Sequence, residues 1–227
     1  MQQLERIILV CGHYGCGKTN LSINLALQYA AAGEKVTLVD LDIVNPYFRS
    51  SDYPQLLKEH GVELIAPTYA HSNVDLPSLP TEMYSVFTRE GRIIIDVGGD
   101  DAGATALGRF APQLGKMKYS MLYVINMYRV MSETPDETVQ LLREIEAASR
   151  MKATGIVNNS HVMNLTTVDD ILKTVEYTAE VSGLTGLPVV ATAVNKKLCS
   201  GLFGVPGEIY PVEVYVKTPW SDSENVN

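Results

Sequence analysis

Cysteine is scarce in this 227-residue chain, which has three cysteines and no C-x-x-C pair. An odd number of cysteines without that spacing argues against a disulfide framework and against a simple zinc site. We therefore expect Cys11, Cys16 and Cys199 to be reduced, small packing side chains. A second role stays open for Cys16, because the nearby Lys18 could lower the pKa of its thiol and make it oxidisable.

Long apolar runs and clusters of basic residues are also missing. No stretch approaches the roughly 20 apolar residues that span a bilayer. The N-terminus, MQQLERIILV, lacks a basic region followed by a long apolar segment and a cleavage site. The net charge of −8 and the pI of about 5.0 give no electrostatic support for binding DNA or an anionic membrane. These absences predict a cytoplasmic protein that binds neither nucleic acid nor membrane.

Internal repeats, low-complexity segments and linkers are absent as well. Hydrophobic residues make up 46% of the chain and charged residues 19%, which is ordinary for a globular protein with a well-filled interior. A chain of this length can bury one large core. We expect a single nucleotide-binding domain over residues 1–227, with a disordered polar tail at 220–227.

What the sequence does contain is a glycine-rich loop after a short apolar run, IILVCGHYGCGKT. It fits the pattern G-x-x-x-x-G-K-[ST], with Gly12, Gly17, Lys18 and Thr19 at the fixed positions. Together with Gly15, these glycines let backbone N–H groups point inward, and the helix that begins near Lys18 adds the positive end of its dipole. The pattern predicts a phosphate site.

Two side chains of this loop have defined tasks in that chemistry. Lys18 would reach the β- and γ-phosphates of a nucleotide, and the Thr19 hydroxyl would occupy one coordination position of Mg²⁺. A glycine-rich turn that binds nothing is disfavoured, because a β-rich run precedes the loop and an amphipathic segment follows it at 20–32. Three further residues complete the expected nucleotide contacts: His13, Cys16 and Asn20.

Strands and helices alternate along the rest of the chain, which predicts an α/β fold in three layers with a mostly parallel twisted sheet. The C-terminal apolar segment alternates with period two, and we expect it at an edge of the sheet, where Pro211 is tolerated. The stretch 68–80 is predicted to be a surface loop. The expected strands are 35–41, 62–67, 92–97, 119–126, 153–158, 188–194 and 209–216, and the expected helices are 20–32, 55–60, 84–88, 135–150 and 167–181.

Carboxylates follow two of these strands. Asp40 and Asp42 come at the end of KVTLVDL, and Asp96 closes the β-branched strand RIIID before Gly98 and Gly99. An acidic residue that ends an apolar strand before glycines is typical of the Mg²⁺ side of a nucleotide site. Alone this signal is weak, and the glycine-rich loop upstream strengthens it.

These pieces in this order, GHYGCGKT, VDLDIVNPYF, IIIDVGG and GIVNN, resemble the MinD/ParA group of P-loop ATPases. That group belongs to the deviant Walker A superfamily, with nitrogenase iron protein and dethiobiotin synthetase. The resemblance covers most of the chain. It implies the P-loop NTPase fold and a switch that acts on a protein partner, in which two subunits close over two ATP molecules and separate after hydrolysis.

The resemblance also implies roles for the acidic residues. Asp42 would position the attacking water, and Asp40 would lie near the metal. Asp96 would hold Mg²⁺ through water, and the Gly99 backbone would sense the γ-phosphate.

Base recognition is assigned by the same resemblance to Asn159 or its neighbour Asn158, since an amide offers the base edge one donor and one acceptor. A guanine-reading N-K-x-D pattern would need an aspartate after Asn195 and Lys196, and none follows. ATP is therefore favoured over GTP.

One position departs from the family pattern. The signature lysine that reaches the partner's phosphates belongs at position 13, where this chain has histidine. Histidine is shorter and partly protonated near neutral pH, so His13 predicts either slow hydrolysis or a substitute cation. Arg49 is the candidate substitute, with a solvated surface charge as its alternative role.

Two other functions stay open at this point. The first is a small-molecule ligase or kinase of the dethiobiotin synthetase type, with residues 68–80 as a substrate wall. The second is a nucleotide-bound scaffold with negligible turnover, suggested by His13. The remaining histidines are scattered singly, and none is expected to bind metal: His60, His71 and His161.

Overall fold

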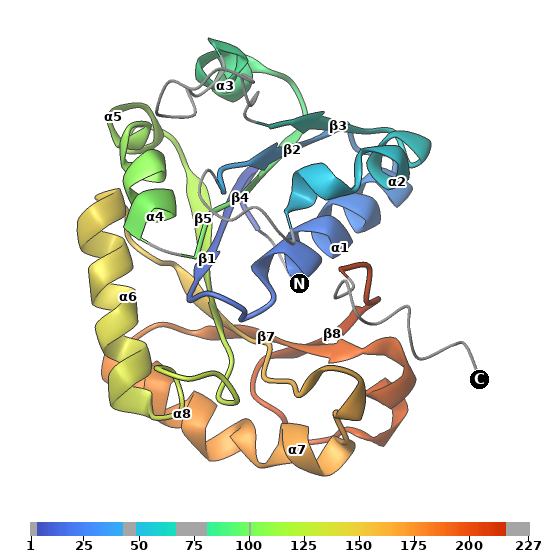
Figure 1. The fold of residues 1–227 in the computed structure, drawn as a ribbon, viewed down its shortest axis with the longest axis vertical. Coiled ribbons are helices and arrows are strands. Elements are labelled where there is room, and N and C mark those ends of the chain that lie inside the picture. The colour runs from blue at the N-terminus through green and yellow to red at the C-terminus, as the bar shows by residue number, and fades with distance from the viewer. Residues whose placement is uncertain (1–3, 43–48, 67–80, 100, 217–227) are drawn as a thin grey trace, which may run out of the picture.

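One parallel sheet runs through the molecule (Figure 1). The computed structural model describes residues 4–42, 49–66, 81–99 and 101–216. Within these ranges the sheet has the order β3-β2-β4-β1-β5-β6-β7-β8, and each neighbouring pair is parallel. The strands are β1 (Ile7–Gly12), β2 (Val36–Asp40), β3 (Val62–Ile65), β4 (Arg92–Asp96), β5 (Tyr119–Ile125), β6 (Gly155–Asn158), β7 (Val189–Asn195) and β8 (Glu208–Val212).

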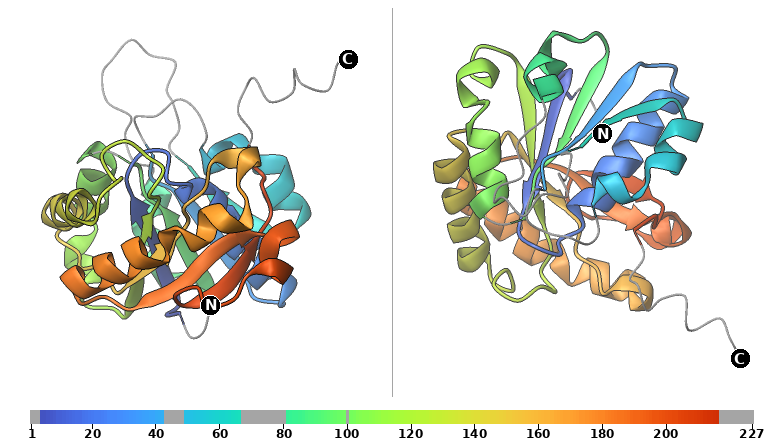
Figure 2. Two further views of the ribbon diagram at one scale, coloured as in Figure 1. Left: turned by 90° about the horizontal axis from the view of Figure 1, so that it is seen from below. Right: turned by 45° about the horizontal axis from the view of Figure 1, so that its top comes forward.

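Helices cover both faces of this sheet, as Figure 1 and Figure 2 show. One face carries α1 (Lys18–Ala31) and α2 (Pro54–Glu59), and the other carries the α4, α6 and α8 helices. The remaining bounds are α3 (Thr81–Ser85), α4 (Asp101–Gly108), α5 (Ala111–Leu114), α6 (Pro135–Ser149), α7 (Val168–Leu172) and α8 (Thr174–Thr185), with 3₁₀ turns at Ser50–Asp52, Val86–Thr88, Met163–Leu165 and Lys196–Gly201.

The alternation of side chains along β1 explains the three layers. Ile7 and Leu9 pack with α6 and α8 on one face, whereas Ile8 and Val10 pack with α1 on the other. All of β1 is buried, as expected for a parallel strand covered by helices on both sides. The predicted α/β/α architecture is confirmed.

The last strand differs in one respect from the expectation. β8 lies at the edge of the sheet, as predicted, and Pro211 is exposed there. However, the segment 188–194 is not the last parallel strand, because β8 also runs parallel to β7. A crossover through the 3₁₀ turn Lys196–Gly201 returns the chain to the same end of the sheet, which makes the described sheet parallel throughout.

The helix predicted at 167–181 is two helices, α7 and α8, which meet at Lys173. The Thr174 hydroxyl donates to the Ile171 carbonyl at 2.7 Å, and such a local hydrogen bond competes with continuous helical pairing. The structure also contains α4 and α5, which the sequence did not predict, because Asp-Ala-Gly-Ala-Thr-Ala-Leu-Gly has two glycines and little apolar periodicity.

Two predictions lie outside the described residues, the loop at 68–80 and the tail at 220–227. Within the described ranges, no helix combines the length and the apolar character needed to cross a membrane.

Candidate functional site

The candidate site lies where the carboxyl ends of β1, β2 and β4 meet. β1 lies between β4 and β5 in the sheet. The chain forms β2, β3 and β4 on one side of β1 and then crosses to form β5 on the other side. In open α/β sheets, ligands bind outside the carboxyl ends of the strands at such a point. The glycine-rich loop follows β1 there and leads directly into α1.

The loop has the backbone conformation that its glycines allow. Gly15 and Gly17 have φ values of 73° and 86°, in the left-handed region that other residues rarely adopt. Gly17 is also the residue before α1, where no side chain caps the helix and no acidic residue occupies the first turn. The first N–H groups of α1 and its positive dipole end are therefore available to an anion.

Lys18 is 7% exposed and lies across the loop, where its Nζ donates to the His13 carbonyl at 3.0 Å. The backbone after β4 reaches the same place. A Cβ added to Gly99 would lie 2.8 Å from Lys18 Nζ and 2.9 Å from the Tyr14 nitrogen. The loop after β4 is thus packed directly on the phosphate loop, at the end where Lys18 places its charge.

Two buried carboxylates lie side by side next to this lysine. Asp40 and Asp96 are paired across β2 and β4, and they are 0% and 1% exposed. Asp96 accepts hydrogen bonds from Ser50 Oγ at 2.6 Å and from Ser22 Oγ at 3.3 Å. A further hydrogen bond comes from the Thr19 side chain. The neighbours of Asp96 are thus hydroxyl groups and a second carboxylate.

Burial decides the protonation of this pair. Burial, reinforced by the charge of Asp40, raises the pKa of Asp96 to about 7, against weaker lowering effects from Ser50, Lys18 and Thr19. Burial also raises the pKa of Asp40, whose carboxylate accepts hydrogen bonds from the backbone of Asp42 and Ser51. A divalent cation beside these carboxylates would favour their charged forms.

The residues at this place fit Mg²⁺. A hard cation prefers oxygen ligands and keeps waters and substrate phosphates in its shell, so it needs few protein side chains. In the described ranges, no group of three or more His, Cys, Asp or Glu side chains could hold a metal. The Thr19 hydroxyl and the Asp96 carboxylate offer oxygens beside Lys18, which suits an ion shared with a nucleotide.

Asp42 lies at the rim of the same site. Its side chain is half-buried, and its Oδ1 atom is 3.3 Å from the position of a Cβ added to Gly98. The residues after β2 and the glycines after β4 are therefore in contact. This contact joins the two segments to which the resemblance assigns water positioning and γ-phosphate sensing.

The asparagines after β6 lie in two different environments. The amide of Asn158 donates to Thr174 Oγ1 at 2.8 Å, and its oxygen accepts from the nitrogen and hydroxyl of Ser160. Both ends of that amide are thus hydrogen-bonded inside the protein, which favours Asn159 of the two predicted base-reading residues. Asn159 contacts the loop instead, since its Nδ2 donates to the Cys16 carbonyl at 2.8 Å.

The side chain of Asn20 contacts the chain after β8. Its Nδ2 donates to the Glu213 carbonyl at 2.9 Å, and its Oδ1 accepts from the Tyr215 nitrogen at 2.8 Å. The Asn20 amide therefore fastens this segment to α1, and the predicted nucleotide contact of Asn20 is left to its backbone.

The thiol of Cys16 is buried, with 1% exposure. Burial raises its pKa, and this effect exceeds the opposite effect of Lys18. The expectation of an oxidisable thiol is wrong, and the packing role is confirmed.

The two candidate trans cations are poorly placed in this structure. Burial and the charge of Lys18 lower the pKa of His13, which keeps its imidazole neutral near pH 7. Arg49 is 7% exposed and precedes the 3₁₀ turn Ser50–Asp52, so it does not project from the surface as a solvated charge would.

Two side chains beside the loop were missed by the sequence reasoning. The Nε atom of Arg129 is 3.3 Å from the position of a Cβ on Gly15, and the Nε2 atom of His161 is 3.3 Å from that of a Cβ on Gly17. No local pattern marks either residue, because both are more than 100 positions from the loop and reach it through the fold.

A parallel sheet with the loop after its central strand, a lysine across that loop and an aspartate closing the adjacent strand defines a P-loop NTPase. A model of the CobQ/CobB/MinD/ParA nucleotide-binding domain matches residues 7–197. The chain belongs to this family, and the resemblance to the MinD/ParA group is confirmed.

Two curated proteins are similar to this chain in sequence. The signal recognition particle 54 kDa proteins of Sulfolobus acidocaldarius and Sulfurisphaera tokodaii are 31% and 30% identical over 161 residues, which is 70% of this chain and 32% of each relative. The chain spans about a third of the length of these relatives.

Two structures show the same fold at low identity. The cell division protein FtsY of Thermotoga maritima has a TM-score of 0.60 at 17% identity, over 83% of this chain and 61% of that one. The signal recognition particle 54 kDa protein of Aeropyrum pernix K1, in complex with GDP, has a TM-score of 0.54 at 16% identity, over 83% of this chain and 41% of that one.

Proposed function

We propose that this protein is a Mg²⁺-dependent ATP-binding protein of the cytoplasm, which hydrolyses ATP slowly and works as a homodimeric switch on a protein partner. One observation carries the proposal: Lys18, Thr19 and Asp96 converge at the carboxyl ends of adjacent strands. Lys18 Nζ donates to the His13 carbonyl of the loop, and Lys18 and Thr19 both favour the charged form of Asp96, so an amine, a hydroxyl and a buried carboxylate lie together at this loop. These are the groups that hold the phosphates and the ion of a nucleoside triphosphate.

ATP rather than GTP is supported by the ends of β6 and β7. Guanine offers hydrogen-bond donors that an aspartate accepts in N-K-x-D sites. After Asn158 the chain continues as Asn-Ser-His, and after Asn195 as Lys-Lys-Leu, so neither strand end supplies that carboxylate. Asn159 is the proposed base-reading residue. The GDP complex of the A. pernix relative makes GTP the competitor to test.

Roles in the reaction follow from position. Asp42 is proposed to orient the attacking water, with Asp40 supporting the ion from behind Asp96. The Gly99 backbone, packed on Lys18 and Tyr14, is proposed to detect the γ-phosphate. A phosphate arriving at Lys18 would meet this backbone directly, which would link nucleotide state to the segment before α4.

Binding is tested by isothermal titration calorimetry with ATP and GTP, with and without Mg²⁺. We expect ATP to bind more tightly than GTP and Lys18→Ala to abolish binding, whereas Lys58→Ala, an exposed lysine on α2, serves as the matched control. Equal or tighter binding of GTP would contradict the base assignment. Absence of binding by either nucleotide would contradict the whole proposal.

The switch is tested by light scattering during gel filtration. The proposal expects a monomer without nucleotide and a dimer with ATP, with Lys18→Ala monomeric in both. A monomer with ATP verified as bound would contradict the dimeric switch, and turnover that rises with one member of a metabolite panel would point to a ligase or kinase instead.

Slow hydrolysis is attributed to the neutral His13. A cation supplied in trans contributes about 10³- to 10⁵-fold in related reactions. We expect His13→Lys to raise the rate of ATP hydrolysis severalfold or more, measured by phosphate release. An unchanged rate would indicate a nucleotide-bound scaffold rather than an enzyme.

A further inference from the structure

Arg129 stands in the loop between β5 and α6, more than 100 residues from the phosphate loop in sequence. Its Nε and Cζ atoms lie 3.3 Å and 3.4 Å from the position of a Cβ on Gly15. The guanidinium is therefore packed closely on the loop, in tight contact with the place that a side chain at position 15 would take. A glycine at this position serves the close approach of Arg129 as well as the positive φ.

The charge of Arg129 is not balanced within the described ranges. Its guanidinium makes one hydrogen bond there, from Nη2 to the thioether sulfur of Met163 at 3.9 Å, and no ion pair. A thioether is a weak acceptor. A half-buried cation with several unused donors, set against a loop of backbone N–H groups, suits an anion that arrives from outside.

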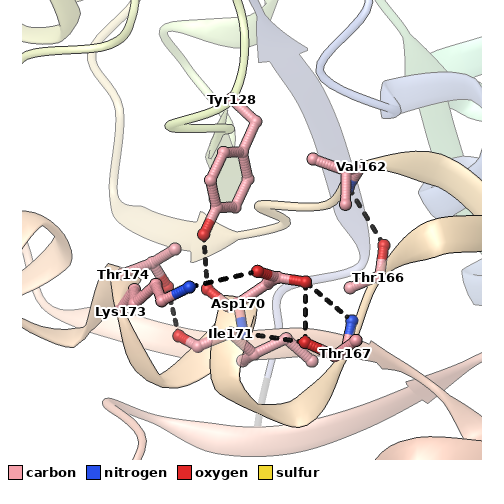
Figure 3. A network of polar contacts seen from close by, with 8 residues as sticks. All are labelled: Tyr128, Val162, Thr166, Thr167, Asp170, Ile171, Lys173 and Thr174. Atoms are coloured by element: carbon pink, nitrogen blue, oxygen red, sulfur yellow. Dashed lines mark hydrogen bonds and ion pairs between the residues drawn. The ribbon is translucent and has the colours of Figure 1, made fainter.

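The backbone around Arg129 is held in place without its side chain. The Arg129 nitrogen donates to the Asn126 carbonyl at 3.2 Å, and the Ser132 nitrogen donates to the Arg129 carbonyl at 3.0 Å. The preceding residue ties this loop to α7, since the Tyr128 hydroxyl donates to the Asp170 carbonyl at 2.7 Å (Figure 3). In Figure 3 the ring of Tyr128 points straight at the start of α7. The turn that carries the guanidinium is thus held by hydrogen bonds in which the guanidinium takes no part.

His161 contributes a neutral neighbour. Its Nδ1 accepts the Met163 N–H at 3.2 Å, which assigns the proton to Nε2, the atom that faces Gly17. Burial and the charge of Arg129 lower the pKa of His161 to about 4. Near neutral pH, Arg129 therefore supplies the positive charge on this side of the loop, and His161 supplies an uncharged N–H.

We infer that Arg129 is a phosphate ligand in cis, whose guanidinium contacts the β-phosphate of the bound nucleotide from the side of Gly15. The inference rests on the proposed nucleotide site and adds a residue to it. Arg129 binds from one side of the loop while Lys18 lies toward His13 and Gly99 on the other. A planar guanidinium can meet two phosphate oxygens at once, which a lysine cannot. The site thereby gains, from its own chain, a charge that His13 does not supply.

The test compares Arg129→Met with Arg143→Met, a matched change at an exposed arginine of α6. Dissociation constants for ATP and ADP are measured by calorimetry in the presence of Mg²⁺. Loss of a hydrogen bond to a charged group is worth a factor of about 10 to 100. We expect Arg129→Met to weaken both nucleotides by this factor, Arg129→Lys to weaken them less, and Arg143→Met to leave them unchanged.

Thermal unfolding without nucleotide separates binding from folding. Because the turn is held by main-chain contacts and Tyr128, Arg129→Met is expected to unfold at the wild-type temperature and to show a smaller rise when ATP is added. Wild-type affinity in Arg129→Met, alongside lost affinity in Lys18→Ala, would overturn this inference and leave the proposed function standing. A loss confined to ATP would also overturn it, because it would place the guanidinium at the γ-phosphate.

Discussion

Close approach of backbones accounts for the glycines at the nucleotide end of the sheet. Gly99 lies against Lys18 and Tyr14, and Gly98 lies against Gly103 of α4 and Asp42. In each case a single methyl group would fall within about 3 Å of atoms that have little freedom to move, so the residue type follows from the space and not from a turn. Gly99 is the position where this packing involves the phosphate loop itself.

Gly99→Ala is expected to displace Lys18 or the loop, because its Cβ would lie 2.8 Å from both Lys18 Nζ and the Tyr14 Cα. Overpacking of this kind costs about 1–3 kcal/mol. The free energy of unfolding measured in urea and the affinity for nucleotide should both fall. Gly183→Ala in α8 is the control, since a Cβ there meets nothing within 4 Å and alanine favours a helix by about 0.5–1 kcal/mol. Equal stability of the two variants would contradict the packing of Gly99.

The burial of the His161 imidazole can be tested by measuring the stability of the protein at acid pH. Its pKa is about 4 in the folded protein and returns toward 6.5 on unfolding. Between these values the unfolded chain binds more protons, so the contribution of His161 to stability is present above pH 6.5 and is lost as the pH falls toward 4. The group facing it is Arg129, which adds to the penalty for a second positive charge.

The expected result is that His161→Gln loses stability less steeply than the wild type over that pH interval, by up to about 1.4 kcal/mol per pH unit. Urea unfolding at several pH values measures this, with the exposed His60→Gln as the control. Parallel curves for the wild type and His161→Gln would contradict the burial of a neutral imidazole.

At the scale of elements, the chain after β8 is tied to α1. Asn24 exchanges two hydrogen bonds with the backbone of Glu213, at 2.8 Å each, and Asn20 holds Tyr215 and Val216. The two asparagines stand one turn apart on α1, directly after Thr19. An extended segment is thus bound by side chains of a helix that begins at the phosphate site.

Asn24→Ala should loosen this segment, because the Glu213 nitrogen loses its partner and the Glu213 carbonyl keeps only its hydrogen bond from Asn20. A buried polar group left unpaired costs about 1–3 kcal/mol. Urea unfolding measures the loss of stability. Amide hydrogen exchange over 213–216 should become faster. Asn164→Ala, at an exposed position, should change neither. Unchanged exchange in Asn24→Ala would contradict a holding role for Asn24 and leave the segment to Asn20 and its apolar contacts.

The same scale shows why some helices were predictable and others were not. α6 has a capping box between Thr134 and Glu137, proline at its start and a repeating apolar face, and all of these are visible in the sequence. α4 has none of them and forms because it packs against α6 and lies on the glycines after β4. The break between α7 and α8 depends on one hydroxyl, Thr174, whose choice of partner a periodic pattern does not express.

At the scale of the whole molecule, nucleotide binding at the proposed site is expected to raise the free energy of unfolding. A ligand that binds the folded state alone adds about 2.7 kcal/mol to the free energy of unfolding at a hundred times its dissociation constant. Mg²⁺ with ATP should therefore raise the unfolding temperature, measured by scanning calorimetry, and Lys18→Ala should remove the rise. The same rise with Mg²⁺ alone would indicate that the carboxylates Asp40 and Asp96 bind the ion without nucleotide.

The sequence by itself determined the layered architecture, the phosphate loop and the carboxylates beside it, since these depend on local conformation and on the meeting of parallel strand ends at one edge. Only the tertiary structure decided the direction of β8, the partners of the Asn158 and Asn20 side chains, the burial of the Cys16 thiol and the arrival of Arg129 and His161 at the loop. Each of these depends on which distant residues share a small volume. A side chain with two available partners takes the one that the fold brings nearer, and spacing along the chain does not encode that distance.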